Sequence, residues 1–353
     1  MRFARLLVTG GAGFIGSAFV RQAVTAGLAE RFTVLDKLTY AGNLTNLASV
    51  ADDPRYEFVQ GDIADEDAVR ALVARSDAVV NFAAETHVDR SILDPRAFFE
   101  TNVRGVQVLL DACRLETQRA KERDRDRAPR FVQVSTDEVY GSVESGESTE
   151  DDRLRPRSPY AAAKAGGELL AFSYGITYGV DVVVTRGANT YGPYHHPEKL
   201  IPLFITNALD DKPLPLYGDG LQRRDWLYVD DHARAIAHVL DHGLTGHAYN
   251  ISSGQERTNR DVVTALLAEL GKPWSLVRTV ADRAGHDRRY AMSSAKLRAL
   301  GWTPTKAFDD GLRATAAWYV ANESWWRSVR SGEWDTYYER QYGDRLAKST
   351  AAG

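Results

Sequence analysis

The stretch that decides the fold is residues 8–16, VTGGAGFIG, which follows a short apolar run and precedes a helical pattern. Gly11, Gly13 and Gly16 fit the spacing G-x-G-x-x-G, and Gly10 supplies a second, overlapping register. Glycine is needed because a Cβ atom would keep a pyrophosphate away from the backbone N–H groups at the positive end of the helix. The stretch therefore predicts a dinucleotide-binding turn between the first strand and the first helix.

Outward from this turn, strand and helix patterns alternate. Apolar runs predict strands at residues 2–10, 31–38, 56–63, 76–84, 130–138 and 180–186, and apolar periodicity predicts helices at 17–27, 65–76, 98–116 and 158–179. Such alternation implies a parallel sheet with right-handed crossovers, covered by helices on both faces. The predicted fold is α/β, with a Rossmann-type doubly wound parallel sheet.

Acidic residues at strand ends point to the cofactor. Asp36 ends the second predicted strand about 20 residues after the glycines, where a carboxylate accepts hydrogen bonds from the adenosine ribose. This position favours NAD over NADP, because a 2′-phosphate would meet negative charge. Asp62 and Ile63 close the third strand, where such folds often hold the adenine. The alternative reading of these two is ordinary strand-end residues.

The alternation of strand and helix patterns ends at about residue 187, after which Pro, Gly, Tyr and charged residues dominate. Residues 226–243 resume a strand and helix pattern that could return to the first domain. We expect an NAD-binding domain of residues 1–186 and 226–250, and a smaller C-terminal α/β nucleotide-sugar-binding domain of residues 187–225 and 251–353. The Trp- and Tyr-rich stretch 316–343 should pack a C-terminal helix onto the second domain. The charged run 115–129 should be a solvated helical extension or loop.

Composition excludes several classes of protein. A single cysteine, Cys113, rules out an intramolecular disulfide framework, and the Cys and His spacing predicts no metal site. The N-terminal apolar run is too short for a signal peptide, and no stretch approaches the roughly 20 apolar residues of a membrane span. A net charge of −4 gives no general electrostatic reason to bind nucleic acid. We expect a cytoplasmic protein that binds neither nucleic acid nor membrane.

Two patterns suggest catalysis. Tyr160 and Lys164 are one helical turn apart and share a face, so the ammonium, together with an oxidised nicotinamide, would lower the phenol pKa towards that of a usable base. Asp137 and Glu138 follow a buried strand directly. Successive side chains of a strand point to opposite faces, so both acids can serve one site only if the strand ends just past Ser135.

With the glycine turn, these residues resemble the extended short-chain dehydrogenase/reductase family, whose catalytic triad implies Thr136, Tyr160 and Lys164. The segments STDEVYG, ETHVDRS, YGPYHHPEKLIPLF, RRDWLYVDDHARA and RAGHDRRYA look more specifically like the dTDP-glucose 4,6-dehydratases. That resemblance implies Asp137 as the acid and Glu138 as the base that eliminate water across C5 and C6 of the sugar. Tyr160 would act at C4, while a tightly bound NAD takes and returns a hydride.

The resemblance also implies the binding residues. For the cofactor these are Gly10, Gly13, Phe14, Ile15, Gly16, Asp36, Lys37, Leu38, Thr39, Gly42, Asp62, Ile63, Ala83, Ala84, Thr101, Tyr160, Lys164 and Thr190. For the substrate they are Thr86, Thr136, Asp137, Glu138, Asn189, Lys199, Leu200, Pro215, Tyr217, Arg224, Asn259 and His286. Thr190 stands where the family commonly has a second Asn, and Thr86 replaces a common Ser.

The family further implies a homodimer built through the helices around 100–116 and 160–178. Two alternatives stay open at this point. One is a dehydratase or 4-epimerase that acts on a UDP-sugar, and the acid pair disfavours the epimerase. The other is a non-catalytic nucleotide-binding scaffold or sensor, which would have no use for the proton donors.

Overall fold

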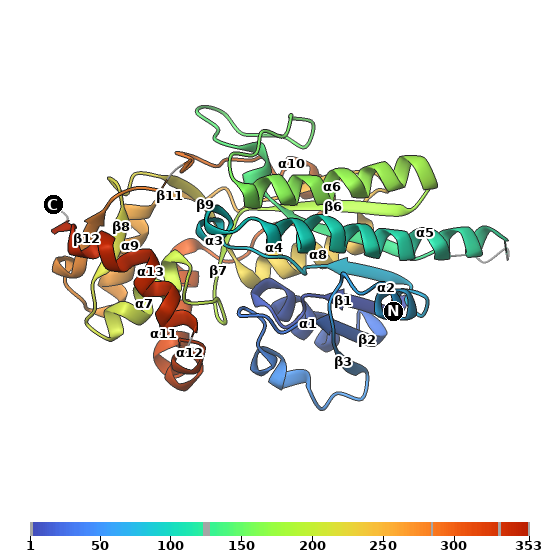
Figure 1. Cartoon of the computed structure of the whole chain (residues 1–353), viewed down its shortest axis with the longest axis horizontal. Helices are drawn as coiled ribbons and strands as arrows, with labels where there is room; N and C mark the ends of the chain where they lie inside the picture. The colour runs from blue at the N-terminus through green and yellow to red at the C-terminus, as the bar shows by residue number, and fades with distance from the viewer. Residues whose placement is uncertain (1–2, 123–127, 284, 331–332, 352–353) are drawn as a thin grey trace.

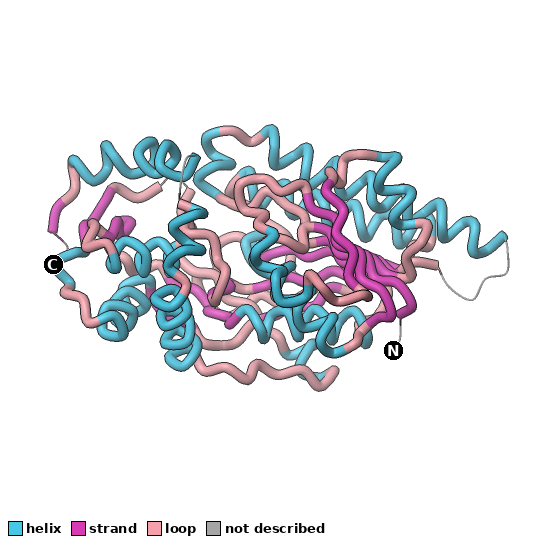
Figure 2. Tube along the Cα trace, turned by 90° about the horizontal axis from the view of Figure 1, so that it is seen from below, coloured by secondary structure: helices cyan, strands magenta, loops and turns pink. Residues whose placement is uncertain are grey.

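The computed structural model describes residues 3–122, 128–283, 285–330 and 333–351. Its centre is a seven-stranded sheet in which every pairing is parallel (Figures 1 and 2). The predicted doubly wound parallel sheet is confirmed. In spatial order its strands are β10 (Ala248–Ile251), β6 (Asp181–Gly187), β5 (Arg130–Thr136), β4 (Ala78–Asn81), β1 (Phe3–Thr9), β2 (Ala29–Asp36) and β3 (Tyr56–Gln60).

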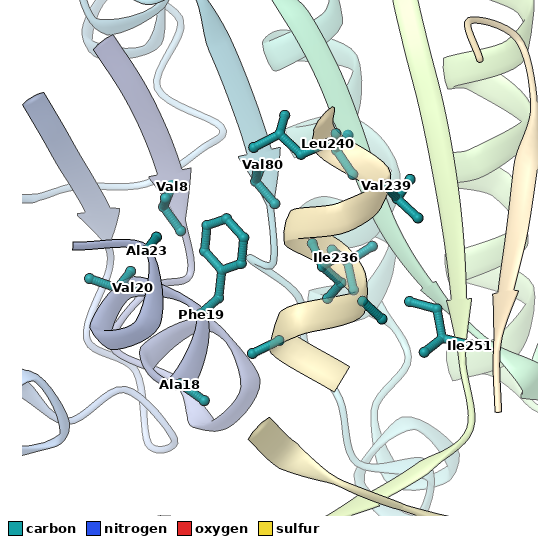
Figure 3. Packing of buried hydrophobic residues seen from close by; sticks show 14 of the residues in the cluster. Val8, Ala18, Phe19, Val20, Ala23, Val80, Ile236, Val239, Leu240 and Ile251 are labelled. Carbon is teal, nitrogen blue, oxygen red and sulfur yellow. The ribbon is translucent and has the colours of Figure 1, made fainter. Parts of the chain in front are cut away.

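Each face of this sheet buries its own helices, because successive strand residues point to opposite faces. Leu6 and Val8 of β1 belong to the core shared with α1 (Phe14–Ala26) and α8 (Val229–His242), whereas Leu7 joins the core on the other face. Figure 3 shows Phe19 of α1 among Val8, Val80 and residues of α8. The opposite face is covered by α2 (Glu66–Val73), α5 (Val106–Glu122) and α6 (Pro159–Tyr178).

The helix predicted over 98–116 is present, but it contains a π-helical turn. The chain forms α3 (Val88–Leu93), α4 (Arg96–Phe99) and then a π-helical segment, Glu100–Gly105, before α5 begins. In this segment Asn102 accepts a hydrogen bond from the Glu85 backbone N–H at 2.9 Å and donates one to the Glu85 carbonyl at 3.0 Å. Gly105 packs so closely on Ile63 that an added Cβ would lie 2.5 Å from its Cδ1 atom. The wider turn follows from these long-range contacts, which helical periodicity does not record.

A second, smaller region carries mixed sheets and its own core. One sheet contains β11 (Glu256–Thr258), β9 (Arg223–Tyr228) and β7 (Asn189–Tyr191), and the other contains β13 (Thr350–Ala351), β12 (Val277–Val280) and β8 (Leu214–Tyr217). Its helices are α7 (Leu200–Leu209), α9 (Asn259–Leu270), α11 (Phe308–Ala321), α12 (Glu323–Val329) and α13 (Glu333–Ala347). The short helix α10 (Ala295–Ala299) packs instead on the large sheet, where Leu297 joins the core shared with α1 and α8. Tyr319, Trp326 and Trp334 are buried in this core, as expected for the aromatic C-terminal stretch.

Three local expectations change. The strand predicted at 226 does not return to the large sheet, because β9 pairs with β7 and β11, whereas α8 and β10 do return. The first helix starts at Phe14 rather than residue 17. The charged run continues α5 to Glu122, and residues 123–127 lie outside the described part of the chain. Among the described helices, none is long and apolar enough to span a membrane.

Candidate active site

The glycine turn between β1 and α1 forms the floor of a large pocket. Gly10 has a φ of 68°, and an added Cβ would lie 2.4 Å from the Ala83 backbone nitrogen. A Cβ on Gly16 would lie 2.3 Å from the Gly10 carbonyl oxygen. Gly10, Gly13 and Gly16 line the pocket, whereas Gly11 packs against the Val34 side chain. The structure therefore uses the register that begins at Gly10.

Asp36 stands at the end of β2, beside this turn. Its carboxylate accepts the Ala12 N–H at 2.9 Å and the Leu38 N–H at 2.8 Å. Burial raises the pKa of Asp36 above its usual value, although these two bonds act against the rise. An ionised carboxylate has about four lone-pair directions, so two remain for ribose hydroxyls. Nearby, the Lys37 ammonium forms an ion pair with the Asp62 carboxylate at 2.7 Å, and both residues line the pocket.

The structure brings together nearly all the predicted cofactor residues. Leu38 is the exception, because its side chain packs against the core on the face of the large sheet that α1 and α8 cover. The pocket-lining residues are Gly10, Gly13, Phe14, Ile15, Gly16, Asp36, Lys37, Thr39, Gly42, Asp62, Ile63, Ala83, Ala84, Thr101, Tyr160, Lys164 and Thr190. Sequence reasoning missed other lining residues, among them Glu85, Tyr194, His195, His196, Glu198 and His232. All six lie inside the motifs quoted above, and this position in a motif is the sequence signal that could have identified them.

The pocket suits a dinucleotide. The N-terminus of α1, capped by Gly13, has no side-chain cap and no acidic residue in its first turn, so its positive end can receive an anion. Buried polar atoms without a hydrogen-bond partner also line the pocket, including Ser135 Oγ, Asn189 Oδ1 and His232 Nε2. Such atoms are rare in proteins and commonly mark the place of a ligand or water.

The acid pair stands where β5 ends. The strand stops at Thr136, and residues Asp137–Tyr140 form a 3₁₀ turn whose first N–H groups are capped by Thr136: its Oγ1 accepts the Glu138 N–H at 3.3 Å. The same hydroxyl donates to Asp137 Oδ1 at 3.1 Å. Because the chain leaves the sheet here, the side chains no longer alternate, and both acids line the pocket.

Burial gives the two acids unusual proton affinities. Asp137 is 4% exposed, and burial together with the charge of Glu138 raises its pKa to about 8. Burial also raises the pKa of Glu138, although Arg283, Lys199 and Arg224 act against the rise. At neutral pH Asp137 is therefore mostly protonated, while three cations favour the ionised form of Glu138. This difference in surroundings suits Asp137 to donate a proton and Glu138 to accept one.

Tyr160 and Lys164 extend from α6 into the same pocket. Lys164 Nζ donates to the Val134 carbonyl at 2.6 Å, and burial lowers the pKa of Lys164 to about 8. Burial and the charge of Glu138 raise the pKa of Tyr160 above its usual value. The expected lowering depends on Lys164 together with an oxidised nicotinamide, and without the nicotinamide burial dominates the pKa of Tyr160.

The predicted substrate residues divide into two groups. Thr86, Asn189 and Lys199 line the pocket with Thr136, Asp137 and Glu138. Leu200, Pro215, Tyr217, Arg224, Asn259 and His286 do not line it. Arg224 is nevertheless close enough to both acids to act on their charges, with its guanidinium over the Tyr290 ring at 4.2 Å.

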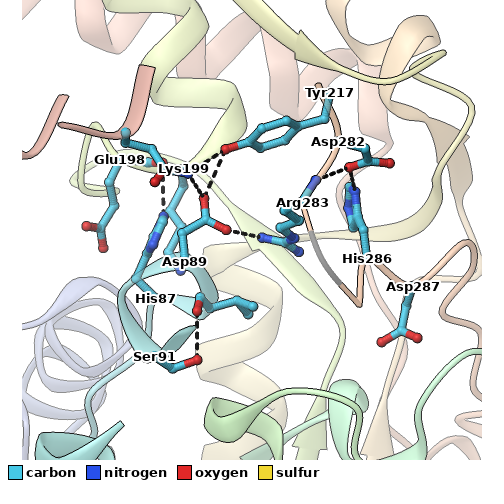
Figure 4. A network of polar contacts seen from close by, with 12 residues as sticks. His87, Asp89, Ser91, Glu198, Lys199, Tyr217, Asp282, Arg283, His286 and Asp287 are labelled. Atoms are coloured by element: carbon cyan, nitrogen blue, oxygen red, sulfur yellow. Dashed lines mark hydrogen bonds and ion pairs between the residues drawn. The ribbon is translucent and has the colours of Figure 1, made fainter. Parts of the chain in front are cut away.

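The residues beyond the acids form the polar network of Figure 4. Tyr217 donates to Asp89 Oδ2 at 3.1 Å, and Arg283 pairs with Asp89 Oδ1 at 3.0 Å. His286 Nδ1 lies 2.6 Å from Asp282 Oδ1. Sequence reasoning missed Arg283, which acts electrostatically on Glu138 and stands in the RAGHDRRYA motif. Arg283, Lys199 and Arg224 therefore place positive charge near Glu138.

Thr190 makes contacts within the protein. Its hydroxyl lies 3.0 Å from the Ala188 carbonyl oxygen and 2.7 Å from His232 Nδ1. Burial lowers the pKa of His232 to about 3, so this imidazole is neutral. An added Cβ on Gly187 would lie 2.3 Å from the same ring. The threonine thus sets the orientation of a histidine in the pocket wall.

Comparisons with known proteins agree with this geometry. Residues 7–315 match the family described as GDP-mannose 4,6 dehydratase. The chain is 51% identical to a dTDP-glucose 4,6-dehydratase of Streptomyces niveus, covering 93% of this chain and 96% of the relative. It is 46% identical to dTDP-glucose 4,6-dehydratase 1 of Escherichia coli, covering 97% and 99%.

Solved structures give the same result. DesIV, the dTDP-glucose 4,6-dehydratase of Streptomyces venezuelae solved with NAD bound, has a TM-score of 0.87 and 53% identity, with 92% of this chain and 99% of that chain covered. A UDP-glucose 4-epimerase of Thermus thermophilus, solved with NAD, has a TM-score of 0.81 and 34% identity over 90% and 99% of the two chains. The chain therefore belongs to the dTDP-glucose 4,6-dehydratases, within the extended short-chain dehydrogenase/reductase family.

Proposed function

We propose that this chain converts dTDP-glucose to dTDP-4-keto-6-deoxyglucose and water. The observation that carries the proposal is the acid pair, Asp137 and Glu138, in one pocket with Tyr160 and the glycine turn. Oxidation and reduction at one carbon need only the triad, whereas elimination needs a base and an acid as well. The names of the curated relatives support the same reaction.

NAD is the proposed cofactor, held by the glycine turn, by Asp36 at the ribose, and by Asp62 and Ile63 at the adenine. When bound, NAD would supply a positive charge beside the phenol and the acceptor for the hydride of sugar C4, which later returns to C6. The open helix end and the free lone pairs of Asp36 support this fit. Asp36 also opposes the 2′-phosphate of NADP.

Tyr160, Thr136 and Lys164 act at C4. Tyr160 takes the proton of the C4 hydroxyl, and Thr136 hydrogen-bonds the same oxygen. Lys164, anchored on the Val134 carbonyl, places its positive charge near the phenol. The ketone that forms at C4 makes the neighbouring C5–H acidic.

Glu138 and Asp137 then complete the elimination. Glu138 removes the C5 proton, Asp137 protonates the departing C6 hydroxyl, and water leaves. The proton on Glu138 exchanges with solvent, and Glu138 then protonates C5 after C6 has been reduced. The raised pKa of Asp137 supports its role as the donor at neutral pH, and the cations around Glu138 support its role as the base. Lys199 and Arg224 are suited to hold the diphosphate.

We also propose a homodimer built through α5 and α6. Leu169 and Ile176 of α6 are 57% and 88% exposed and lie seven residues apart, so they share one face of the helix, which suits an apolar contact with a partner. Phe99, at the end of α4, is also exposed. We expect Ile176→Glu to halve the mass measured by light scattering; an unchanged mass would move the interface elsewhere.

The test of function is direct incubation of the purified protein with dTDP-glucose, UDP-glucose and GDP-mannose. We expect a 4-keto-6-deoxy product, visible by its absorbance in alkali, from dTDP-glucose at the highest kcat/KM. Conversion of UDP-glucose to UDP-galactose would instead identify a 4-epimerase. Binding without any conversion would identify a scaffold or sensor.

A further inference from the structure

Two loops form walls of the same pocket. Residues 37–42 follow Asp36, and all but Leu38 and Tyr40 line the pocket. Residues 194–199 lead into α7, and all but Pro197 line it. Leu38 and Tyr194, one in each loop, have φ angles of 56° and 67°. Non-glycine residues persist in this region only when their surroundings hold them there.

Glu198, in the loop of residues 194–199, connects it to the loop of residues 37–42. Its Oε1 accepts a hydrogen bond from Tyr40 at 3.1 Å, and its Oε2 accepts one from Arg90 Nε at 3.1 Å. The Glu198 side chain is only 1% exposed. Burial would raise its pKa, but the surrounding His87, His196, Lys199 and Arg90 lower it to about 2, so the carboxylate is ionised.

Arg90 also stabilises the contact between Tyr40 and Glu198 by packing against aromatic rings. Its guanidinium lies over the Tyr40 ring at 3.9 Å and over the ring of Tyr337, in α13, at 4.4 Å. His87, from the start of α3, lies between the Glu198 carbonyl and Tyr337, at 3.4 Å from each (Figure 4 shows it beside Glu198). The contact thus ties a loop of the large sheet to α3 and to the C-terminal helix.

We propose that Tyr40, Glu198 and Arg90 form a clasp that closes the pocket over the adenosine half of bound NAD and slows NAD release. The inference rests on the proposed use of NAD. The adenosine half is assigned because the Tyr40 loop begins beside Asp36. Parting the walls would remove the Tyr40 hydrogen bond from a buried carboxylate, which is costly. A cofactor that is regenerated within each cycle has no need to leave.

The test compares Glu198→Gln and Tyr40→Phe with the wild type. Each protein is loaded with radiolabelled NAD and chased with excess unlabelled NAD, and the NAD content after purification is measured as well. We expect Glu198→Gln to release NAD at least tenfold faster and Tyr40→Phe about fivefold faster, because the latter loses one hydrogen bond but keeps the ring under Arg90. The matched control is Glu323→Gln, which removes an exposed carboxylate paired with Arg327 on α12.

Circular dichroism and thermal melting check that each variant is folded. If Glu198→Gln does not fold, Tyr40→Phe carries the test alone. Release at the wild-type rate in every folded variant would overturn the clasp, and so would equally fast release in the Glu323→Gln control. If the wild type converts dTDP-glucose while the clasp variants hold NAD normally, the proposed function stands and the clasp fails. A wild type that binds no NAD would overturn both.

Discussion

The pKa of Asp137 gives the sharpest prediction, tested by Asp137→Asn. Asparagine keeps the shape of the side chain but has no proton to give to the leaving hydroxyl. General acid catalysis typically contributes about 10²- to 10⁴-fold. We therefore expect kcat for dTDP-glucose to fall by about that factor in the variant, while NAD binding is retained.

The same pKa sets a pH limit. Wild-type activity should fall above about pH 8, where Asp137 loses its proton, and this alkaline limb should be absent from the residual activity of Asp137→Asn. The pH profile of kcat, followed by the alkali absorbance of the keto product, measures both. An alkaline limb that is identical in the variant would show that another group causes it.

Stability provides an independent readout. The pKa of Asp137 is raised in the folded state. Between roughly pH 4 and 8, Asp137 therefore keeps its proton in the folded state but has released it in the unfolded state. Its contribution to stability is therefore lost as pH rises through about 8. From pH 6 to 9 the wild type should lose about 3 kcal/mol relative to Asp137→Asn, at about 1.4 kcal/mol for each of two units. Parallel melting curves for the two proteins at both pH values would refute the buried, protonated aspartic acid.

Three further predictions follow from the contacts in the pocket. Gly16→Ala should purify with little bound NAD, because the added Cβ would lie 2.3 Å from the Gly10 carbonyl oxygen. One bound NAD per protein, measured by absorbance, would contradict this. Asp36→Ala should narrow the preference for NAD over NADP by about tenfold or more in Kd, and an unchanged ratio by calorimetry would remove Asp36 from ribose recognition. Lys164→Met should move the acid limb of the pH profile of kcat to higher pH, because loss of a neighbouring positive charge raises the pKa of Tyr160. An acid limb at the wild-type pH would show that the lysine has only a structural role.

The sequence was most informative where function depends on local geometry. The glycine turn, Asp36 and the acid pair at the end of β5 each follow from a few neighbouring residues, because turns, helix ends and strand ends have local requirements. Even there, the choice between Gly10 and Gly11 needed the structure, since it depends on how closely Ala83 and Val34 approach.

Contacts between distant segments were not predictable. The π-helical turn at 100–105 depends on Asn102 meeting the Glu85 backbone, which no helical pattern encodes. Glu198 acquires its partners from a loop and from α3, both more than 100 residues away in the sequence. The strong effect of burial on the pKa of Tyr160 was not predictable either, because depth in a pocket cannot be read from residue spacing.

The central claim is that the two acids perform the elimination, and Glu138→Gln in deuterated solvent tests it most directly. With dTDP-glucose and bound NAD, we expect the variant to build up absorbance at 340 nm as C4 is oxidised, yet to form no product and place no deuterium at C5. The wild type should form product with one deuterium at C5. Full turnover with deuterium at C5 in the variant would contradict the claim, because another residue would then remove that proton.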